Sequence, residues 1–390
     1  MMTKDQEHLI EATAPLVAEH IEAITQRFYP LMFDRYPDVK PLFNETNQKS
    51  GQQPRALAAA VVAYVQMRGN PEMVRDKMAV AVSKHISLGI RADQYPIVGE
   101  CLIAAVADVL GEAVTPEIAE AWTALYWELA ELLIEMEDVR YAAFEHLPGG
   151  WRGARRFRIA STQQESAVIR SFLLEPEDGG AVADFEPGQF IGVRLTIDNE
   201  PLYRHYSLSD APNGRAYRIS VKRDPEGRAS RHLHDTMQVG DTLDLLPPSG
   251  DLTLEAGHEP LLLVSGGVGQ TPMLPLARQA LAEGRRVVYL HAALDADHHA
   301  FADEIAALRQ RHPEQMHAVS IYENGSGADH VGRIDRDLLA RYLPDDEARC
   351  YFVGPGPFMT VVDAALEQLG VPEDRRHYEY FGPSQPLNAA

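Results

Sequence analysis

A glycine-rich turn is the first feature of the sequence whose residue types suggest chemistry. Gly266-Gly-Val-Gly-Gln-Thr-Pro272 follows an apolar run, Leu261–Ser265, and precedes a helical pattern that opens at Pro272. In such a turn the backbone N–H groups and the positive end of the helix can bind a phosphate, and only glycine lets the chain approach it closely. Because the spacing is not Gly-x-Gly-x-x-Gly, a tight connection without a ligand remains the alternative for this segment alone.

A second glycine-rich segment, Gly354-Pro-Gly-Pro-Phe-Met359, follows another apolar run, Cys350–Val353. In a parallel sheet, ligands bind at the carboxyl ends of the strands, where the loops of different strands converge. We therefore expect the two glycine-rich loops to meet at one crevice. This expectation favours a nucleotide site over a plain connection.

A third group of polar residues, Arg204-His205-Tyr206-Ser207, lies in the middle of the chain. An arginine can pair with a pyrophosphate, a tyrosine can stack on a flat ring, and a serine hydroxyl can bond to a ring nitrogen. Taken alone, the segment is more typical of an exposed strand with one salt bridge. Pro187-Gly-Gln-Phe190 before it and Gly227-Arg-Ala-Ser230 after it favour the ligand-binding interpretation.

The N-terminal part of the chain holds a candidate metal ligand, His85, which follows one apolar helical pattern and precedes another helix. The chain has 15 histidines, and a lone histidine in such a place is more often a core or surface residue. The same region contains further side chains of interest: Tyr29, Phe43, and Gln53 with Leu57, which share a helix face four residues apart.

The elements that must position these residues begin with a helical stretch, residues 1–146. Apolar side chains recur there at three- and four-residue spacing, from Ala12 to Phe33 and again within 57–65, 97–110 and 122–136. No period-2 alternation appears, so the stretch predicts an all-α domain. The turn-rich segment 147–152 predicts a linker.

The rest of the chain reads as two further domains. Short β-type runs separated by turn residues predict an antiparallel β-barrel over residues 153–259. These runs are Phe157–Ser161, Ala167–Leu174, Gln189–Leu195, Tyr217–Lys222 and Thr242–Leu246. From residue 260 to 390, strands alternate with helices, which predicts a doubly wound α/β domain. The expected strands are 261–265, 287–291, 316–322 and 350–353, and the expected helices are 272–283, 301–310, 336–342 and 360–369.

Composition limits the partners and the location. A chain of 390 residues that is 45% hydrophobic and 24% charged is typical of globular proteins with two or three domains. Its net charge of −21 disfavours nucleic acid and anionic membranes as partners. Cys101 and Cys350 lie far apart, which excludes a disulfide scaffold or a cysteine-ligated metal site. Without a membrane-length apolar run or a signal-like start, we expect a soluble, cytoplasmic monomer that needs no protein partner.

The five ordered motifs of residues 153–390 resemble those of the ferredoxin–NADP⁺ reductase family of flavin reductases. That resemblance implies FAD and NAD(P)H as cofactors. The residues implied for FAD are Phe190, Arg204, His205, Tyr206, Ser207, Ser230 and, near the C-terminus, Phe381. The residues implied for the nicotinamide nucleotide are Gly267, Val268, Gly269, Gln270, Thr271, Pro272, Gly354 and Phe358.

The reductase half departs from the family pattern at two positions. Val353 stands where many members have a cysteine, and Phe190 replaces a frequent tyrosine. The first change leaves no thiol beside the nicotinamide, which should retune hydride transfer without abolishing it. The second removes one possible hydroxyl contact to the flavin. We expect neither change to disable the reductase. The segment after the second strand offers Asp295 and Asp297 and no arginine for a 2′-phosphate, which favours NADH over NADPH.

Residues 1–146 are similar to a globin, and together with the reductase half the chain resembles the flavohaemoglobins, the nitric oxide dioxygenases of bacteria and fungi. The resemblance implies haem b, with His85 as the proximal ligand of the iron. It implies that Tyr95 and Glu137 accept the second imidazole N–H and tune the ligand. Glu135, two residues before Glu137, should face about 200° around the helix and point elsewhere.

The same resemblance assigns roles on the distal side of the haem. It implies that Tyr29 and Gln53 donate hydrogen bonds to iron-bound oxygen, that Phe43 packs against the haem and that Leu57 restricts the space above the iron. Lys84 matches a position that modulates the haem potential. The residues alone leave alternatives open: Tyr29, Gln53 and Leu57 could serve ordinary helix packing. Glu137 could lie on a solvated helix face, and Lys84 on the surface.

The function implied is the conversion of NO and O₂ to nitrate, with electrons passed from NAD(P)H through FAD to haem, and hence NO detoxification. One alternative is a haem-based sensor of O₂ or NO, or an oxygen-binding protein with NADH oxidase activity. Another is a flavin reductase whose helical domain binds a partner and holds no haem.

Overall fold

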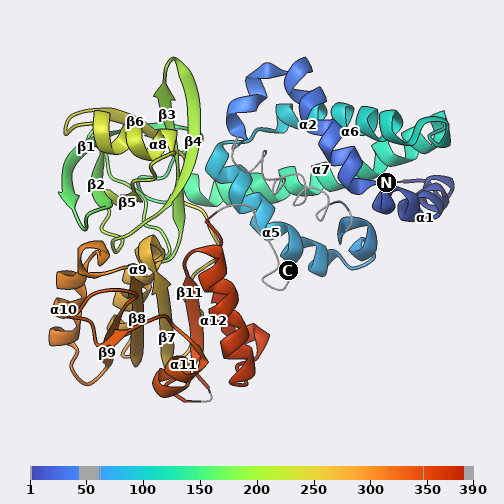
Figure 1. The fold of residues 1–390 in the computed structure, drawn as a ribbon. Helices are drawn as coiled ribbons and strands as arrows, with labels where there is room; N and C mark the ends of the chain where they lie inside the picture. Colours follow the sequence, from blue (N-terminus) through green and yellow to red (C-terminus); the bar gives the residue numbers. More distant parts are fainter. Residues whose placement is uncertain (1, 44–60, 62, 346, 382–390) are drawn as a thin grey trace. The chain divides into compact units, whose positions relative to one another are not determined.

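The computed structural model describes residues 2–43, 61, 63–345 and 347–381 (Figure 1). In this range the chain forms two compact units, divided near residue 145. The first unit is helical, and the second contains two β-sheets.

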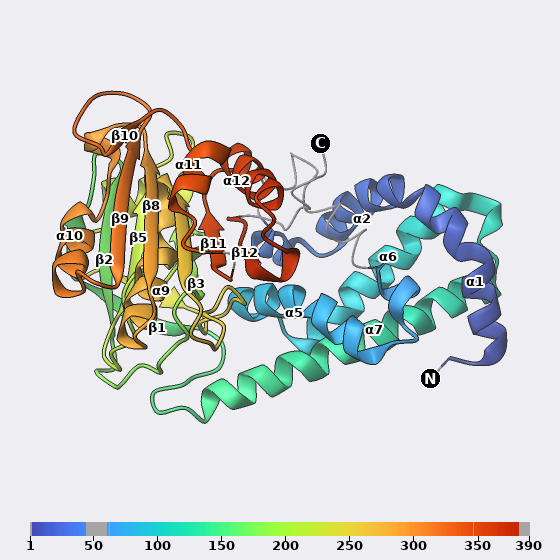
Figure 2. The same cartoon turned by 90° about the horizontal axis from the view of Figure 1, so that it is seen from below.

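Helices joined by short turns make up the described part of the first unit, which confirms the predicted all-α domain. The helices are α1 (Lys4–Glu19), α2 (Ile21–Arg35), η1 (Pro37–Leu42), α5 (Pro71–Leu88), η2 (Ala92–Gln94), α6 (Tyr95–Leu110), η3 (Gly111–Ala113) and α7 (Pro116–Glu145). Figure 2 shows the long helix α7 running past α5 and α6. Their apolar faces enclose one core, in which Ile24, Val82, Val106 and Leu125 are buried.

The boundaries of α5 position the candidate histidine. The helix begins after Asn70, whose side chain accepts a hydrogen bond from the Met73 N–H, and it has Pro71 in its first turn. It ends at Gly89, whose φ of 69° is readily adopted by glycine alone. His85 therefore lies inside α5, in its last turn, whereas the sequence places it after a helical pattern.

The predicted helix between Ala12 and Phe33 is in fact two helices. His20, with φ −104° and ψ 9°, leaves the helical conformation between α1 and α2. Its ring Nδ1 lies 3.0 Å from the Leu16 carbonyl oxygen, and such local side-chain contacts compete with the helical hydrogen-bond ladder. Periodicity alone does not reveal this break, because the apolar spacing continues across it.

The first sheet of the second unit has six strands and confirms the predicted antiparallel domain. They are β1 (Arg155–Gln164), β2 (Ile169–Pro176), β3 (Phe190–Ile197), β4 (Glu200–Ser207), β5 (Tyr217–Lys222) and β6 (Thr242–Leu245), in the order β4-β3-β6-β1-β2-β5. Although β6 is the last strand in sequence, it lies between β3 and β1 and pairs antiparallel with both. Two short helices, α8 (Arg228–Arg231) and η4 (His232–Thr236), connect β5 to β6.

The second sheet is parallel, as the alternation of strands and helices predicts. Its strands are β7 (Leu261–Gly266), β8 (Val287–Ala293), β9 (Met316–Tyr322), β10 (His330–Val331), β11 (Arg349–Val353) and β12 (Arg376–Tyr378), in the order β10-β9-β8-β7-β11-β12. Its helical segments are η5 (Gly267–Gly269), α9 (Gln270–Ala282), η6 (Ala296–His298), α10 (Ala302–Arg311), α11 (Arg336–Tyr342), α12 (Gly356–Gln368) and η7 (Glu373–Arg375).

Helices cover both faces of this parallel sheet (Figures 1 and 2). Leu263 and Tyr289 pack toward α9 and α10, where Met273 and Leu308 are also buried. On the opposite face, Val264 and other strand residues form a second apolar layer with α11 and α12. This doubly wound arrangement leaves the carboxyl ends of the strands for the glycine-rich loops.

Over the described ranges, no helix is both long enough and apolar enough to cross a membrane. Cys101 and Cys350 are both buried and neither forms a disulfide.

Candidate functional site

Three polar side chains meet inside the helical unit at His85. The Nδ1 atom of His85 lies 2.7 Å from Oε1 of Glu137 and 3.1 Å from the Tyr95 hydroxyl. The Tyr95 hydroxyl also donates to the same Glu137 oxygen, at 2.5 Å. Glu137 comes from α7 and is almost fully buried, with its side chain 5% exposed, whereas the His85 side chain is 32% exposed.

The hydrogen-bond pattern fixes which nitrogen of the imidazole carries the proton. A buried carboxylate accepts hydrogen bonds, so Nδ1 must be protonated to donate to Glu137. Burial, reinforced by the negative charge of Glu137, raises the pKa of Tyr95, which therefore keeps its proton at neutral pH. In this tautomer the neutral form of the imidazole leaves Nε2 bare, and this atom makes no hydrogen bond to any residue that the structure describes. A neutral imidazole with a carboxylate behind it is a common metal ligand.

Packing around Tyr126 holds Tyr95 in place, and Glu135 takes no part in the triad. The Tyr126 hydroxyl donates to the Tyr95 carbonyl oxygen at 2.6 Å. The Tyr126 ring lies against Gly99, where a Cβ atom would come within 2.5 Å of it. Glu135 points away from His85, as expected, and pairs with Arg75 on the surface at 3.2 Å.

An aromatic cluster lies on α2 and the turn that follows it. The rings of Tyr29 and Phe43 have centroids 5.6 Å apart, and Phe33 lies 5.3 Å from Phe43 and 6.0 Å from Tyr29. Sequence reasoning names Tyr29 and Phe43 and misses Phe33, which its position four residues after Tyr29 on one helix could have indicated. Lys84 is half-buried beside His85 on α5. Gln53 and Leu57 lie outside the described residues.

In the antiparallel sheet, the structure brings two of the predicted FAD residues together. The rings of Phe190, on β3, and His205, on β4, have centroids 5.1 Å apart. Gly188, with φ 100°, turns the chain into β3 at a place where a Cβ would collide with the Leu252 carbonyl oxygen. Gly250, with φ 120°, packs directly on the Phe190 ring.

The other predicted FAD residues are less closely connected. Ser207 is buried, and its hydroxyl has no hydrogen-bond partner among the described residues. Burial raises the pKa of Tyr206, while the charge of Arg204 beside it acts in the opposite direction. The Ser230 hydroxyl accepts from the Asp224 N–H at 3.1 Å within its own loop. Phe381 is half exposed and is the last residue that the structure describes. Among the described residues, neither Phe381 nor Ser230 makes a hydrogen bond or ring contact with the other predicted FAD residues.

The two glycine-rich loops of the parallel sheet meet, as expected from the sequence. Gly267 has φ 54°, and α9 begins at Gln270 rather than at the predicted Pro272. A Cβ on Gly269 would collide with the Val353 carbonyl oxygen and crowd the Gly354 N–H. The loops pack this tightly because β7 and β11 are parallel neighbours that end at the same edge.

Further residues of the second loop and of α9 complete this edge. The Phe358 ring covers Gly354 and lies 3.2 Å from the place of a Cβ on Gly266. The Thr271 hydroxyl donates to the Val268 carbonyl oxygen at 2.9 Å, and Thr271 and Pro272 are buried. The side-chain amide of Gln270 is fully buried, and neither its nitrogen nor its oxygen has a partner in the described part of the chain.

The acidic residues after β8 are partly engaged in local bonds. Asp295 accepts a hydrogen bond from the His298 N–H and lies 2.6 Å from the Nδ1 atom of the same histidine. The contact with His298 lowers the pKa of Asp295. The carbonyl oxygen of Asp297 accepts from the Ala167 N–H at 2.7 Å.

Comparison with known proteins matches three family descriptions in the order in which these features occur. They are Globin over residues 26–133, Oxidoreductase FAD-binding domain over 156–254 and Oxidoreductase NAD-binding domain over 263–364. A curated flavohemoprotein of Pseudomonas aeruginosa is 46% identical over 100% of both chains. The chain belongs to the flavohemoprotein family. A flavohemoprotein of Pseudomonas putida is 45% identical and covers 99% of the chain and 100% of its own length.

Solved structures of flavohemoprotein relatives agree with this family. The crystal structure of a flavohemoglobin from Malassezia yamatoensis with bound FAD and heme has a TM-score of 0.87 and 29% identity, and the match covers 97% of this chain and 99% of that one. The FAD/NAD-binding domain of a nitric oxide dioxygenase from Vibrio cholerae is 39% identical, with a TM-score of 0.56, and covers 60% of this chain and 100% of that one.

As a flavohemoprotein, the chain is an oxidoreductase whose cofactors are haem, FAD and a nicotinamide nucleotide. The described residues fit these groups. The bare Nε2 of His85 suits an iron atom. The partnerless buried hydroxyl of Ser207 suits a polar ring edge, and the close approach of Gly269 to the second loop forms a cradle that any side chain would fill.

Proposed function

We propose that this oxidoreductase is a nitric oxide dioxygenase, which converts NO and O₂ to nitrate with electrons from NAD(P)H. The observation that carries the proposal is the buried contact of 2.7 Å between His85 Nδ1 and the Glu137 carboxylate. A carboxylate partner makes an imidazole a stronger electron donor, which suits activation of oxygen better than its reversible storage. A reductase within the same chain supplies the electrons that repeated turnover requires.

Each residue then has a specific task. When bound, FAD accepts a hydride from NAD(P)H and releases electrons singly, and haem supplies the iron at which O₂ and NO react. His85 is the proximal ligand through Nε2, Glu137 holds the proton on Nδ1, and Tyr95 orients Glu137. We assign the distal hydrogen bonds to Tyr29 and Gln53.

The remaining predicted residues complete the proposal. Phe43, Leu57 and Lys84 shape the haem pocket. Phe190, Arg204, His205, Tyr206, Ser207, Ser230 and Phe381 hold FAD. Gly267 to Pro272, Gly354 and Phe358 hold the nucleotide. We propose that it is NADH, because the short segment directly after β8 holds Asp295 and Asp297 and no arginine for a 2′-phosphate.

We further propose that the domains extend over 1–146, 153–259 and 260–390, and that the chain acts as a monomer without an obligate protein partner. A single chain that carries both the electron donor site and the reacting site needs no separate reductase.

The direct test is the product formed from NO in air by the haem- and FAD-loaded chain supplied with NADH. We expect one nitrate per NO consumed and NADH oxidation that accelerates when NO is added. A loaded protein that leaves NO unchanged would contradict the proposal. NADH oxidation that is equal with and without NO would instead indicate a sensor or an oxidase, and a purified protein without a Soret band would indicate a flavin reductase.

A further inference from the structure

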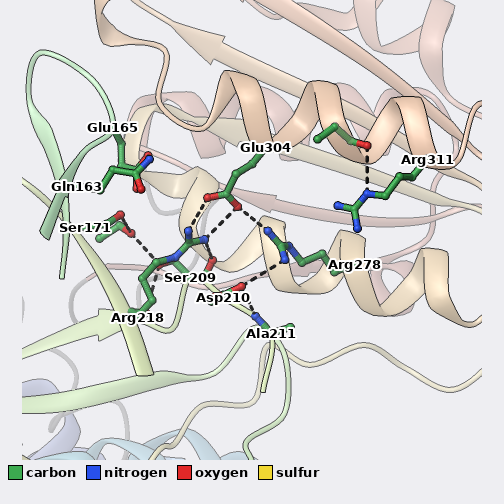
Figure 3. A network of polar contacts seen from close by, with 12 residues as sticks. Gln163, Glu165, Ser171, Ser209, Asp210, Ala211, Arg218, Arg278, Glu304 and Arg311 are labelled. Atoms are coloured by element: carbon green, nitrogen blue, oxygen red, sulfur yellow. Dashed lines mark hydrogen bonds and ion pairs between the residues drawn. The ribbon is translucent and has the colours of Figure 1, made fainter. Parts of the chain in front are cut away.

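A cluster of charged side chains connects the antiparallel sheet to two helices, α9 and α10, that pack on the parallel sheet (Figure 3). Glu304, on α10, lies between two arginines. Its Oε1 atom is 2.5 Å from Nη1 of Arg218, and its Oε2 atom is 2.6 Å from Nη2 of Arg278. Arg278 also pairs with Asp210 at 3.4 Å. We call these four residues, Asp210, Arg218, Arg278 and Glu304, the clasp.

The members of the clasp come from elements that carry the two nucleotide sites. Arg218 lies on β5 of the antiparallel sheet, and the loop Asp224–Ser230 follows that strand directly. Arg278 lies on α9, whose first residue follows the glycine-rich turn. Glu304 therefore links the strand before one predicted cofactor loop to the helix after the other.

The contact of Arg218 with α10 has a second component. Its guanidinium lies 5.3 Å from the centre of the Phe301 ring, within the range of a cation–π interaction. Phe301 has φ 58°, a left-handed conformation that is unusual for a residue with a bulky side chain. Arg218 also donates to the Ser209 carbonyl oxygen and to the Ser209 hydroxyl. Arg218 is thus held on one side by Ser209, which follows β4, and on the other by residues at the start of α10.

Burial strengthens these ion pairs. The side chains of Arg218 and Glu304 are 13% and 22% exposed. Burial opposes the ionisation of Glu304, but the hydrogen bonds and charges of Arg218 and Arg278 outweigh it, so the pKa of Glu304 lies below its usual value. Breaking one member of such a cluster leaves an uncompensated charge in a poorly solvated place.

We infer that Glu304 is a positioning residue for hydride transfer: by holding Arg218 and Arg278 together, it sets the distance between the two cofactors of the reductase half. The inference rests on the proposed function only in requiring that NADH reduces FAD. Hydride transfer needs the reacting atoms in close contact, and a misplacement of about 1 Å can cost about a hundredfold in rate. The clasp acts at a distance from the cofactor loops and contributes no reacting group.

The test is anaerobic, rapid-mixing reduction of the loaded full chain by NADH, with no NO present, so failure of the NO reaction leaves it unaffected. We expect Glu304→Gln to lower the limiting rate of flavin reduction about tenfold and to change the apparent Kd for NADH less than about twofold. The primary deuterium isotope effect with labelled NADH should rise. Arg278→Met, which retains the pair between Arg218 and Glu304, should show the same pattern more weakly.

Asp345→Asn is the matched control, because it removes an ion pair of 2.8 Å with Arg286 that lies outside the clasp. Hydrogen exchange provides a readout independent of activity: Glu304→Gln should increase exchange in both 223–231 and 270–282. Unchanged limiting rates in both clasp variants, or faster exchange confined to α10, would overturn the inference. An equal rate loss in Asp345→Asn would overturn it as well.

Discussion

At the scale of single residues, the proton on His85 is the most informative detail of the site. Glu137 is the group that keeps this proton on Nδ1, because it accepts the hydrogen bond from Nδ1. The Tyr95 hydroxyl donates its own hydrogen bond to the same carboxylate oxygen. If Glu137 became neutral, the imidazole would lose its anionic partner while keeping its place in α5. The electron donation of His85, the proposed iron ligand, would change, whereas its position would not.

Replacing Glu137 with glutamine tests this directly. The amide keeps the shape of the carboxylate but cannot carry its charge, so we expect NO consumption to fall at least about tenfold. The iron–histidine stretching frequency of the reduced protein, measured by resonance Raman spectroscopy, should fall as well. Glu135→Gln is the control, since Glu135 lies two residues away and pairs with Arg75. Equal effects of the two changes would refute the role of Glu137.

At the scale of elements, the packing of the two glycine-rich loops depends on one position. Gly269→Ala would place a methyl group against the Val353 carbonyl oxygen, so η5 must move away from β11. We expect the apparent Kd for NADH to rise about tenfold or more, because the backbone N–H groups of the turn would be misplaced. Binding is measured by titration of the oxidised protein with NAD⁺ and by flavin reduction.

Gly356→Ala is the control for this change. Gly356 opens α12 on the neighbouring loop, and no atom lies within 4 Å of the place where its Cβ would stand. The Gly356→Ala variant should have the same apparent Kd for NADH as the unmodified chain. If both alanine variants bind NADH normally, close approach at Gly269 is not needed for the site.

The elements also show how far sequence patterns reach. Repeating patterns predicted α6 and α7, α1 with α2 as a single helix, and the central strands of both sheets, because those segments bury at least one face along their length. They gave no range for α5, the helix that carries His85. Three edge strands were missed. Glu200–Ser207 contains a proline and no alternation. His330–Val331 and Arg376–His377–Tyr378 are too short to show a pattern, so each is defined only by its partner strand.

The candidate site also combines residues that a local sequence pattern predicts with residues that only distant contacts define. Motifs located the glycine-rich loops and the resemblance located His85 with Glu137, although 52 residues separate them. The clasp gave no signal at all, since Arg218 and Glu304 are 86 residues apart and neither belongs to a motif. Such pairs become visible only when the packing of distant elements is known.

At the scale of the whole molecule, the stability of the second unit should depend on the clasp and therefore on pH. Glu304 has a pKa below its ordinary value of 4.5 in the folded protein. It therefore stabilises the fold above about pH 4.5, and this contribution is lost as the pH falls through the lowered pKa. We expect Glu304→Gln to lower the melting temperature by roughly 3–6 °C near pH 7 and by much less at pH values below the lowered pKa of Glu304.

Calorimetry of the full chain at several pH values measures this difference. Asp303→Asn, at an exposed position on the same helix, should leave the melting temperature unchanged throughout. A difference between Glu304→Gln and the unmodified chain that persists at low pH would show that its origin is not ionic.

The net charge of −21 gives a second prediction at this scale. NADH is itself an anion, so the field of the protein opposes its approach, and added salt screens that field. We expect the second-order rate constant for flavin reduction by NADH to increase roughly two- to threefold between about 0.01 and 0.15 M ionic strength. Rapid mixing in potassium chloride measures it, and an uncharged osmolyte serves as control. A rate constant that falls with salt would indicate a local positive surface that outweighs the net charge.

The central place of β6 has a consequence for synthesis on the ribosome. The other strands of the first sheet emerge earlier, yet β1 and β3 are joined only when Thr242–Leu245 arrives between them. Until then the nascent chain carries two additional open strand edges, on β1 and β3, which are templates for pairing with other chains. The speed of translation between Lys222 and Leu245 therefore sets how long each new molecule is exposed to aggregation.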